Sequence, residues 1–181
     1  MGDLRFERTD ELLQLHFLKL LAEVPFERIS VSKLAKASKI DRTTFYAHYE
    51  NTYQLAETLI NNHISHIKAV FKNSARQHLN KADFDNYSYF SEELVGYLMA
   101  HRQEIQQLRR LNFGRNSFND QLRNLFHQAY AQTLHLVDGD FSQYIMTTLA
   151  MSNFDFIMER QRVPSKSEIK AGLAKMLTYL A

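Results

Sequence analysis

Residues 28–49 read RISVSKLAKASKIDRTTFYAHY, and this stretch decides the fold. It predicts two short helices, the first beginning after Ser30 and the second after Asp41, since both residue types are favoured as N-caps. A break at residues 38–40 separates the helices. Apolar or small residues are spaced to pack the two helices against each other: Leu34, Ala35, Ile40 and Phe45. This pattern predicts a helix-turn-helix, whose second helix can enter the major groove of DNA.

The outward positions of the second helix carry hydroxyl, imidazole and guanidinium groups, which suit phosphate oxygens and base edges. They are Arg42, Thr43, Thr44, Tyr46, Ala47 and His48. Although the net charge is only +2, five cations lie between residues 28 and 48 against Asp41 alone: Arg28, Lys33, Lys36, Lys39 and Arg42. A local basic patch is the electrostatic signature of phosphate binding. The alternative interpretation is an ordinary solvated helix face.

The rest of the chain also has helical periodicity. Only 5 Gly and 2 Pro occur in 181 residues, which argues for long helices rather than many short strands. Helices are predicted at 9–24, with Thr9 as its cap, then within 30–48 as two short ones, from 51 to about 71, and at 88–100, 102–112, 117–137, 141–162 and 165–180. Residues 80–87 are a predicted loop. We therefore expect an all-α protein of about nine helices.

Several classes of protein do not fit this composition. Cysteine is absent, so disulfides and thiolate chemistry are excluded. The N-terminus lacks the apolar core of a signal peptide, and no stretch has the ~18 apolar residues of a membrane span. These features predict a cytoplasmic protein. There is no glycine-rich phosphate loop, nucleophile elbow or HExxH motif, so we expect neither an enzyme nor a bound cofactor.

The stretch LLAEVPFERISVSKLAKASKIDRTTFYAHYENTYQLAETLI, residues 20–60, resembles the N-terminal head of the TetR family of transcription regulators. The resemblance covers about residues 9–60, roughly a third of the chain. It is carried by Pro25-Phe26, Ser30-Val31, Thr44-Phe45-Tyr46, His48-Tyr49 and Leu55, in that order and spacing.

The resemblance implies a homodimer that binds a near-palindromic DNA operator. Its DNA-binding domain would be residues 1–50, with three helices, and residues 51–181 would sense a small-molecule effector and dimerise. Repression is the usual role in the family. The alternatives are an activator working with a co-activator protein, or a helical protein-interaction module that has lost DNA binding.

Residue by residue, the resemblance assigns DNA contacts to Arg42, Thr43, Thr44, Tyr46 and His48, with Phe45 buried among them. The sequence departs from the family pattern twice. Lys39 stands where a glycine often makes the turn, so a left-handed backbone is expected at a non-glycine residue. Thr52 stands where a lysine often contacts phosphate, and the helix N-terminus could make that contact instead.

The last two helices are the predicted dimer interface. Residues 141–162 are apolar around nearly the whole helix, and such a helix must be covered on every side. Residues 165–180 carry an apolar stripe that includes Ile169, Leu173 and Leu177. Two such helices from each subunit would form a four-helix bundle. The alternative is burial within one chain.

An effector cavity is expected to be apolar with a few polar groups, and its candidate residues are His63, Tyr97, Phe126 and Tyr130. His63 lies within the apolar stripe of the fourth helix, three residues before His66. Two imidazoles at this spacing could bind a metal, but no third ligand can be named, so no metal site is predicted. The further alternative for His63 is a core histidine satisfied by a neighbour.

Overall fold

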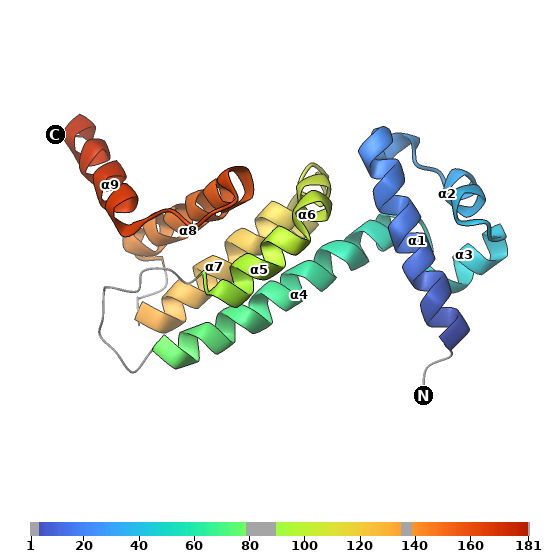
Figure 1. Ribbon diagram of the computed structural model, residues 1–181, viewed down its shortest axis with the longest axis horizontal. Coiled ribbons are helices and arrows are strands. Elements are labelled where there is room, and N and C mark those ends of the chain that lie inside the picture. The colour runs from blue at the N-terminus through green and yellow to red at the C-terminus, as the bar shows by residue number, and fades with distance from the viewer. Residues whose placement is uncertain (1–3, 79–89, 135–138, 181) are drawn as a thin grey trace. The chain divides into compact units, whose positions relative to one another are not determined.

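The computed structural model describes residues 4–78, 90–134 and 139–180, and within these ranges the chain contains helices and no strand (Figure 1). This confirms the predicted all-α fold. The α-helices are α1 (Leu4–Glu23), α2 (Val31–Ser38), α3 (Arg42–His48), α4 (Thr52–His78), α5 (Glu92–Ala100), α6 (Arg102–Leu108), α7 (Phe118–Leu134), α8 (Phe141–Arg160) and α9 (Lys166–Leu180). Two short 3-10 helices, η1 (Phe26–Arg28) and η2 (Gly114–Asn116), lie in the connections. None of the described helices has the length and apolar character needed to cross a membrane.

Several predicted helix ends differ from the observed ones. Helix α1 begins at Leu4, so Thr9 does not cap it; the Thr9 hydroxyl donates a hydrogen bond back to the Arg5 carbonyl instead. Helix α5 begins at Glu92 rather than near residue 88, because the Ser91 hydroxyl accepts a hydrogen bond from the Leu94 N–H. Helix α6 ends at Leu108 rather than residue 112. The predicted loop at 80–87 lies outside the described residues.

The chain divides into two compact units. The first unit comprises Met1–Ile64 and Gln103–Asp120, and the second comprises Ser65–Arg102 and Gln121–Ala181. The first unit is larger than the predicted head of residues 1–50, because the first part of α4 and residues 103–120 belong to it. Its fully buried side chains come from all these segments: Leu13, Phe17, Leu34, Phe45, Leu55, Ile60, Ile105, Leu108 and Phe118.

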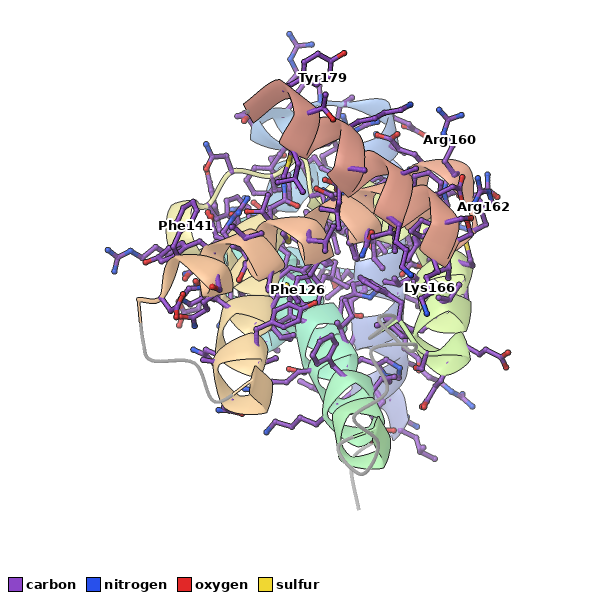
Figure 2. The ribbon with its side chains drawn as sticks, turned by 90° about the vertical axis from the view of Figure 1, so that its left-hand side faces the viewer. Phe126, Phe141, Arg160, Arg162, Lys166 and Tyr179 are labelled. Carbon is purple, nitrogen blue, oxygen red and sulfur yellow. The ribbon has the colours of Figure 1, made fainter. Side chains whose placement is uncertain are left out.

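Helix α8 is covered on one side only. In the second unit it buries a mixed face that includes Gln143, Phe154 and Ile157, and its N-terminal part leaves large apolar side chains exposed: Phe141, Tyr144 and Ile145. Burial within one chain, the alternative to a dimer interface, therefore does not cover α8 all round. Along α9, Leu173, Met176, Leu177 and Tyr179 are exposed as well. Figure 2 shows Phe141 and Tyr179 pointing away from the helices of this unit.

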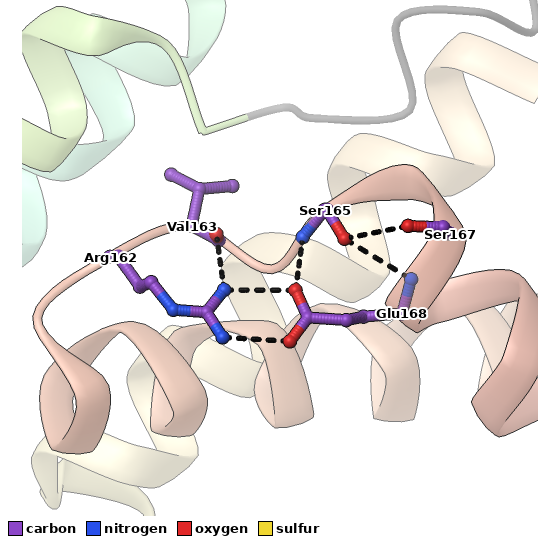
Figure 3. A network of polar contacts seen from close by, with 5 residues as sticks. All are labelled: Arg162, Val163, Ser165, Ser167 and Glu168. Atoms are coloured by element: carbon purple, nitrogen blue, oxygen red, sulfur yellow. Dashed lines mark hydrogen bonds and ion pairs between the residues drawn. The ribbon is translucent and has the colours of Figure 1, made fainter.

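A reciprocal hydrogen-bonded cap fixes the start of α9 (Figure 3). The Glu168 N–H donates to the Ser165 hydroxyl at 3.2 Å, and the Ser165 N–H donates to the Glu168 carboxylate at 2.8 Å. Arg162 adds a bidentate pair to the same carboxylate, at 2.7 and 2.8 Å. These bonds, the one from Arg162 foremost, lower the pKa of Glu168 far below its ordinary value. Ser165 and Glu168 thus form a capping box at the start of α9.

Candidate nucleic-acid interface

The turn between α2 and α3 is made by a left-handed residue that is not glycine. Lys39 has φ 55° and ψ 42°, as expected from its place in the sequence. The Ile40 N–H donates back to the Ala35 carbonyl at 3.0 Å, which closes the C-terminal end of α2. The other end of α2 is capped by the Ser30 hydroxyl, which accepts from the Lys33 N–H at 3.2 Å. Hydrogen bonds thus close both ends of α2, and α3 begins three residues after Lys39.

Helix α3 buries one aromatic residue and exposes the next. Phe45 is 0% exposed, whereas Tyr46 is 49% exposed. Arg42, one turn earlier, donates a hydrogen bond to the Tyr46 hydroxyl at 3.4 Å, and its guanidinium lies 6.0 Å from the Tyr46 ring centroid. Thr43 is exposed and Thr44 half-buried. The outer face of α3 therefore presents a guanidinium, a phenol and hydroxyls.

The predicted basic patch is accessible. All five of its cations are exposed: Arg28, Lys33, Lys36, Lys39 and Arg42. Within the described part of the chain, none of the five forms an ion pair with a carboxylate. Cations without a carboxylate partner can neutralise phosphates without first breaking a salt bridge.

Two of the predicted DNA-contacting residues are largely covered. The His48 side chain is only 3% exposed, because the Phe6 ring stacks on its imidazole with centroids 3.8 Å apart. Thr52 is 8% exposed. Neither side chain therefore lies on the exposed surface with Arg42 and Tyr46. The sequence pattern could not reveal this, since the cover on His48 comes from α1.

Helix α1 holds the end of α3 through residues four apart, which share one helix face. Phe6 stacks on His48, Asp10 lies 3.6 Å from the His48 Nδ1, and Gln14 donates to the Tyr49 hydroxyl at 3.1 Å. Burial, followed by the hydrogen bond with Asp10, raises the pKa of the Tyr49 phenol above its ordinary value. This clamp was not predicted, although the four-residue spacing of Phe6, Asp10 and Gln14 places them on one face of α1.

The predicted effector residues belong to different units. In the first unit, His63 is 6% exposed and its Nε2 lies 3.5 Å from a Glu104 carboxylate oxygen. In the second unit, Phe126 is buried against Phe71 and Phe90, Tyr130 is buried, and Tyr97 stacks on His66. The effector role of these four residues stays a prediction. The contact with Glu104 fits the alternative of a core histidine satisfied by a neighbour.

The fold and this surface define an all-α protein with a helix-turn-helix that exposes a basic and polar second helix. No protein-family model matches the chain. Over 59 residues it is 44% identical to a protein of Bacillus subtilis (strain 168) described as the uncharacterized HTH-type transcriptional regulator YxbF. That match covers 32% of this chain and 16% of the Bacillus protein.

Proposed function

We propose that this protein is a DNA-binding transcription regulator of the TetR type, a repressor that binds a near-palindromic operator as a homodimer and whose DNA binding responds to a small molecule. The observation that carries the proposal is the outer face of α3, where Arg42, Thr43 and Tyr46 are accessible while Phe45 anchors the helix in the core. The similarity to a transcriptional regulator supports it.

In this proposal α3 enters the major groove. Arg42, Thr43, Thr44 and Tyr46 contact bases and phosphates, while Lys33, Lys36 and Lys39 contribute nearby positive charge for phosphate. His48 and Thr52 are omitted from the contact surface because they are covered. A phosphate-binding patch of this size makes operator affinity fall steeply as salt is raised.

The test is selection of bound duplexes from a random pool, followed by affinity measurements with the full chain. Arg42→Ala and Tyr46→Ala should each weaken binding to the selected duplex by about 10- to 100-fold, the effect of losing a base or phosphate contact. Arg123→Ala removes an arginine of α7 that is also exposed and is the matched control, expected to bind as the parent does. If the pool yields no preferred sequence, or if both α3 variants bind as the parent does, the proposed interface is wrong.

Dimerisation through α8 and α9 is proposed from their exposed apolar side chains. Leu177 is 64% exposed, and Phe141, at the N-terminal end of α8, is 75% exposed. Covering this surface with a second copy would remove apolar area from water. Leu177→Asp should give a folded monomer by light scattering, because the residue is exposed in the single chain. Lys175→Asp, on the same helix outside the apolar stripe, is the control, and a stable dimer of the Leu177 variant would refute this interface.

A further inference from the structure

A pocket of about 490 Å³ lies within the first unit, next to the helix-turn-helix. Its walls are the C-terminal end of α1, the residues that lead through η1, the second residue of α4, and the end of α6 with the segment that follows it. The apolar part of the wall includes Leu21, Val24 and Leu111. This volume is in the range that holds a drug-sized molecule. None of the residues predicted to meet an effector lines it.

Three aromatic rings meet at the pocket. Phe26 lies edge-on to Tyr53 and Phe113, with ring centroids 4.7 and 5.3 Å away, and Tyr53 and Phe113 lie 5.5 Å apart. Phe26 is buried, whereas Tyr53 is 54% exposed and Phe113 half-buried. Such rings offer apolar contact to a flat molecule and an electron-rich face to a cation.

The electrostatics of the wall favour a positive ligand. Glu23 and Glu27 both line the pocket, against the single cation Arg110. Helix α1 ends at Glu23 with no basic residue in its last turn, so the partial negative charge of its C-terminal carbonyls is not offset within the helix. Gln107 also lines the pocket, and its amide oxygen Oε1 is buried without a hydrogen-bond partner among the described residues. An N–H donor would satisfy that oxygen.

We propose that this pocket binds a protonated organic amine with an aromatic body, and that its occupancy changes the affinity of the protein for DNA. The ammonium group faces the two glutamates and Gln107, and the aromatic body lies against Phe26, Tyr53 and Phe113. The effect on DNA affinity rests on the proposed function, whereas the binding of the amine does not.

The coupling follows from where the rings sit in the chain. Phe26 precedes α2, and Tyr53 is the second residue of the helix that follows α3. A ligand that contacts both rings therefore contacts residues on either side of the helix-turn-helix. If occupancy favours one arrangement of these ends, operator DNA and the amine change each other's affinity by the same factor.

The binding test uses three indoles that differ only in their end group: tryptamine is a cation, tryptophol is neutral and indole-3-propionate is an anion. The chain has no Trp, so indole fluorescence anisotropy reports the probe alone. Tryptamine should bind at least about fivefold more tightly than tryptophol, and the propionate should bind weakest. The pocket would not be an amine-binding site if tryptophol or the propionate bound as tightly as tryptamine or more tightly. The same conclusion would follow if tryptamine did not bind at millimolar concentration.

Variants of exposed side chains locate the site without disturbing the core. Glu23→Gln with Glu27→Gln should weaken tryptamine binding about three- to tenfold, and Arg110→Gln should strengthen it. Glu11→Gln, an exposed glutamate of α1 outside the pocket, is the matched control. If the double variant and the control bind tryptamine alike, the pocket is not the binding site.

Titration of tryptamine into the complex with a selected operator then tests the coupling. A change in operator affinity that disappears in the Glu23 and Glu27 double variant supports it, and an unchanged affinity at saturating tryptamine refutes it. Tryptamine binding in a protein that selects no DNA would refute the proposed function and leave the pocket standing. Operator binding without tryptamine binding would refute the pocket as an amine-binding site and leave the proposed function standing.

Discussion

Two neighbouring aromatic residues of α3 should respond to truncation in opposite ways. Phe45→Ala should destabilise the first unit, and any loss of DNA binding in this variant should result from unfolding. Tyr46→Ala should weaken DNA binding with little effect on stability. Phe45 is 0% exposed and packs against Tyr49, with ring centroids 6.0 Å apart, whereas Tyr46 is 49% exposed. Comparing the two variants therefore distinguishes the residue that anchors α3 in the core, Phe45, from the residue that α3 exposes to DNA, Tyr46.

The expected magnitudes follow from burial. Removing a fully buried phenylalanine side chain costs about 3–5 kcal/mol, through lost transfer free energy and the cavity left behind. Truncating an exposed side chain changes stability by ~0.5 kcal/mol. Losing the contact of Tyr46 with the Arg42 guanidinium, 6.0 Å from the ring centroid, adds another ~0.5 kcal/mol, the low end for an exposed cation–π contact. The two variants should therefore differ by at least ~2 kcal/mol, about a 30-fold difference in the opening equilibrium.

Hydrogen exchange of the α2 and α3 amides is the suitable assay, because it reports opening of this segment in a chain with two units. Amides of α7 serve as the internal reference. Operator affinity is measured on the same samples. Equal loss of protection in the two variants would refute the assignment of Phe45 as anchor and Tyr46 as contact. If Tyr46→Ala retained full operator affinity, only the proposed contact between Tyr46 and DNA would be refuted.

Three further predictions concern the turn, the start of α9 and the clamp on α3. Lys39→Gly should raise the melting temperature, since it relieves about 1 kcal/mol of left-handed strain at φ 55°, whereas Lys36→Gly within α2 should lower it. The lowered pKa of Glu168, due first to the hydrogen bond from Arg162, means that its ionised form stabilises the start of α9 and that this stabilisation is lost as pH falls below 4.5. Exchange protection of the first α9 amides should follow that titration in the parent and be low and pH-independent in Glu168→Gln. The raised pKa of Tyr49, caused mainly by burial, contributes stability below pH 10.0 that is lost at higher pH. Denaturant unfolding should show this alkaline decline in the parent and less of it in Tyr49→Phe; an equal decline in both would contradict the assignment.

The local features of the helix-turn-helix were predictable from the sequence because they depend on neighbouring residues. Ser30 caps α2 through an N–H three residues ahead, and Lys39 takes the left-handed turn that its position required. At the start of α4, the Gln54 N–H likewise donates to the Asn51 side-chain oxygen at 2.9 Å. Each of these interactions spans four residues or fewer and so depends on local sequence, although the left-handed turn at Lys39 was expected from the family pattern rather than from spacing.

What only the tertiary structure decided is which side chains of those helices remain accessible. Periodicity placed His48 on the outer face of α3, yet Phe6, 42 positions earlier in the chain, covers it. The pocket in the first unit likewise combines the end of α1 with residues 107–113. Helical periodicity is a property of one segment, whereas exposure depends on every segment that packs against it. The sequence by itself therefore determined the all-α class, the helix-turn-helix and its exposed Arg42 and Tyr46, and packing between distant segments determined which other side chains a ligand or DNA can reach.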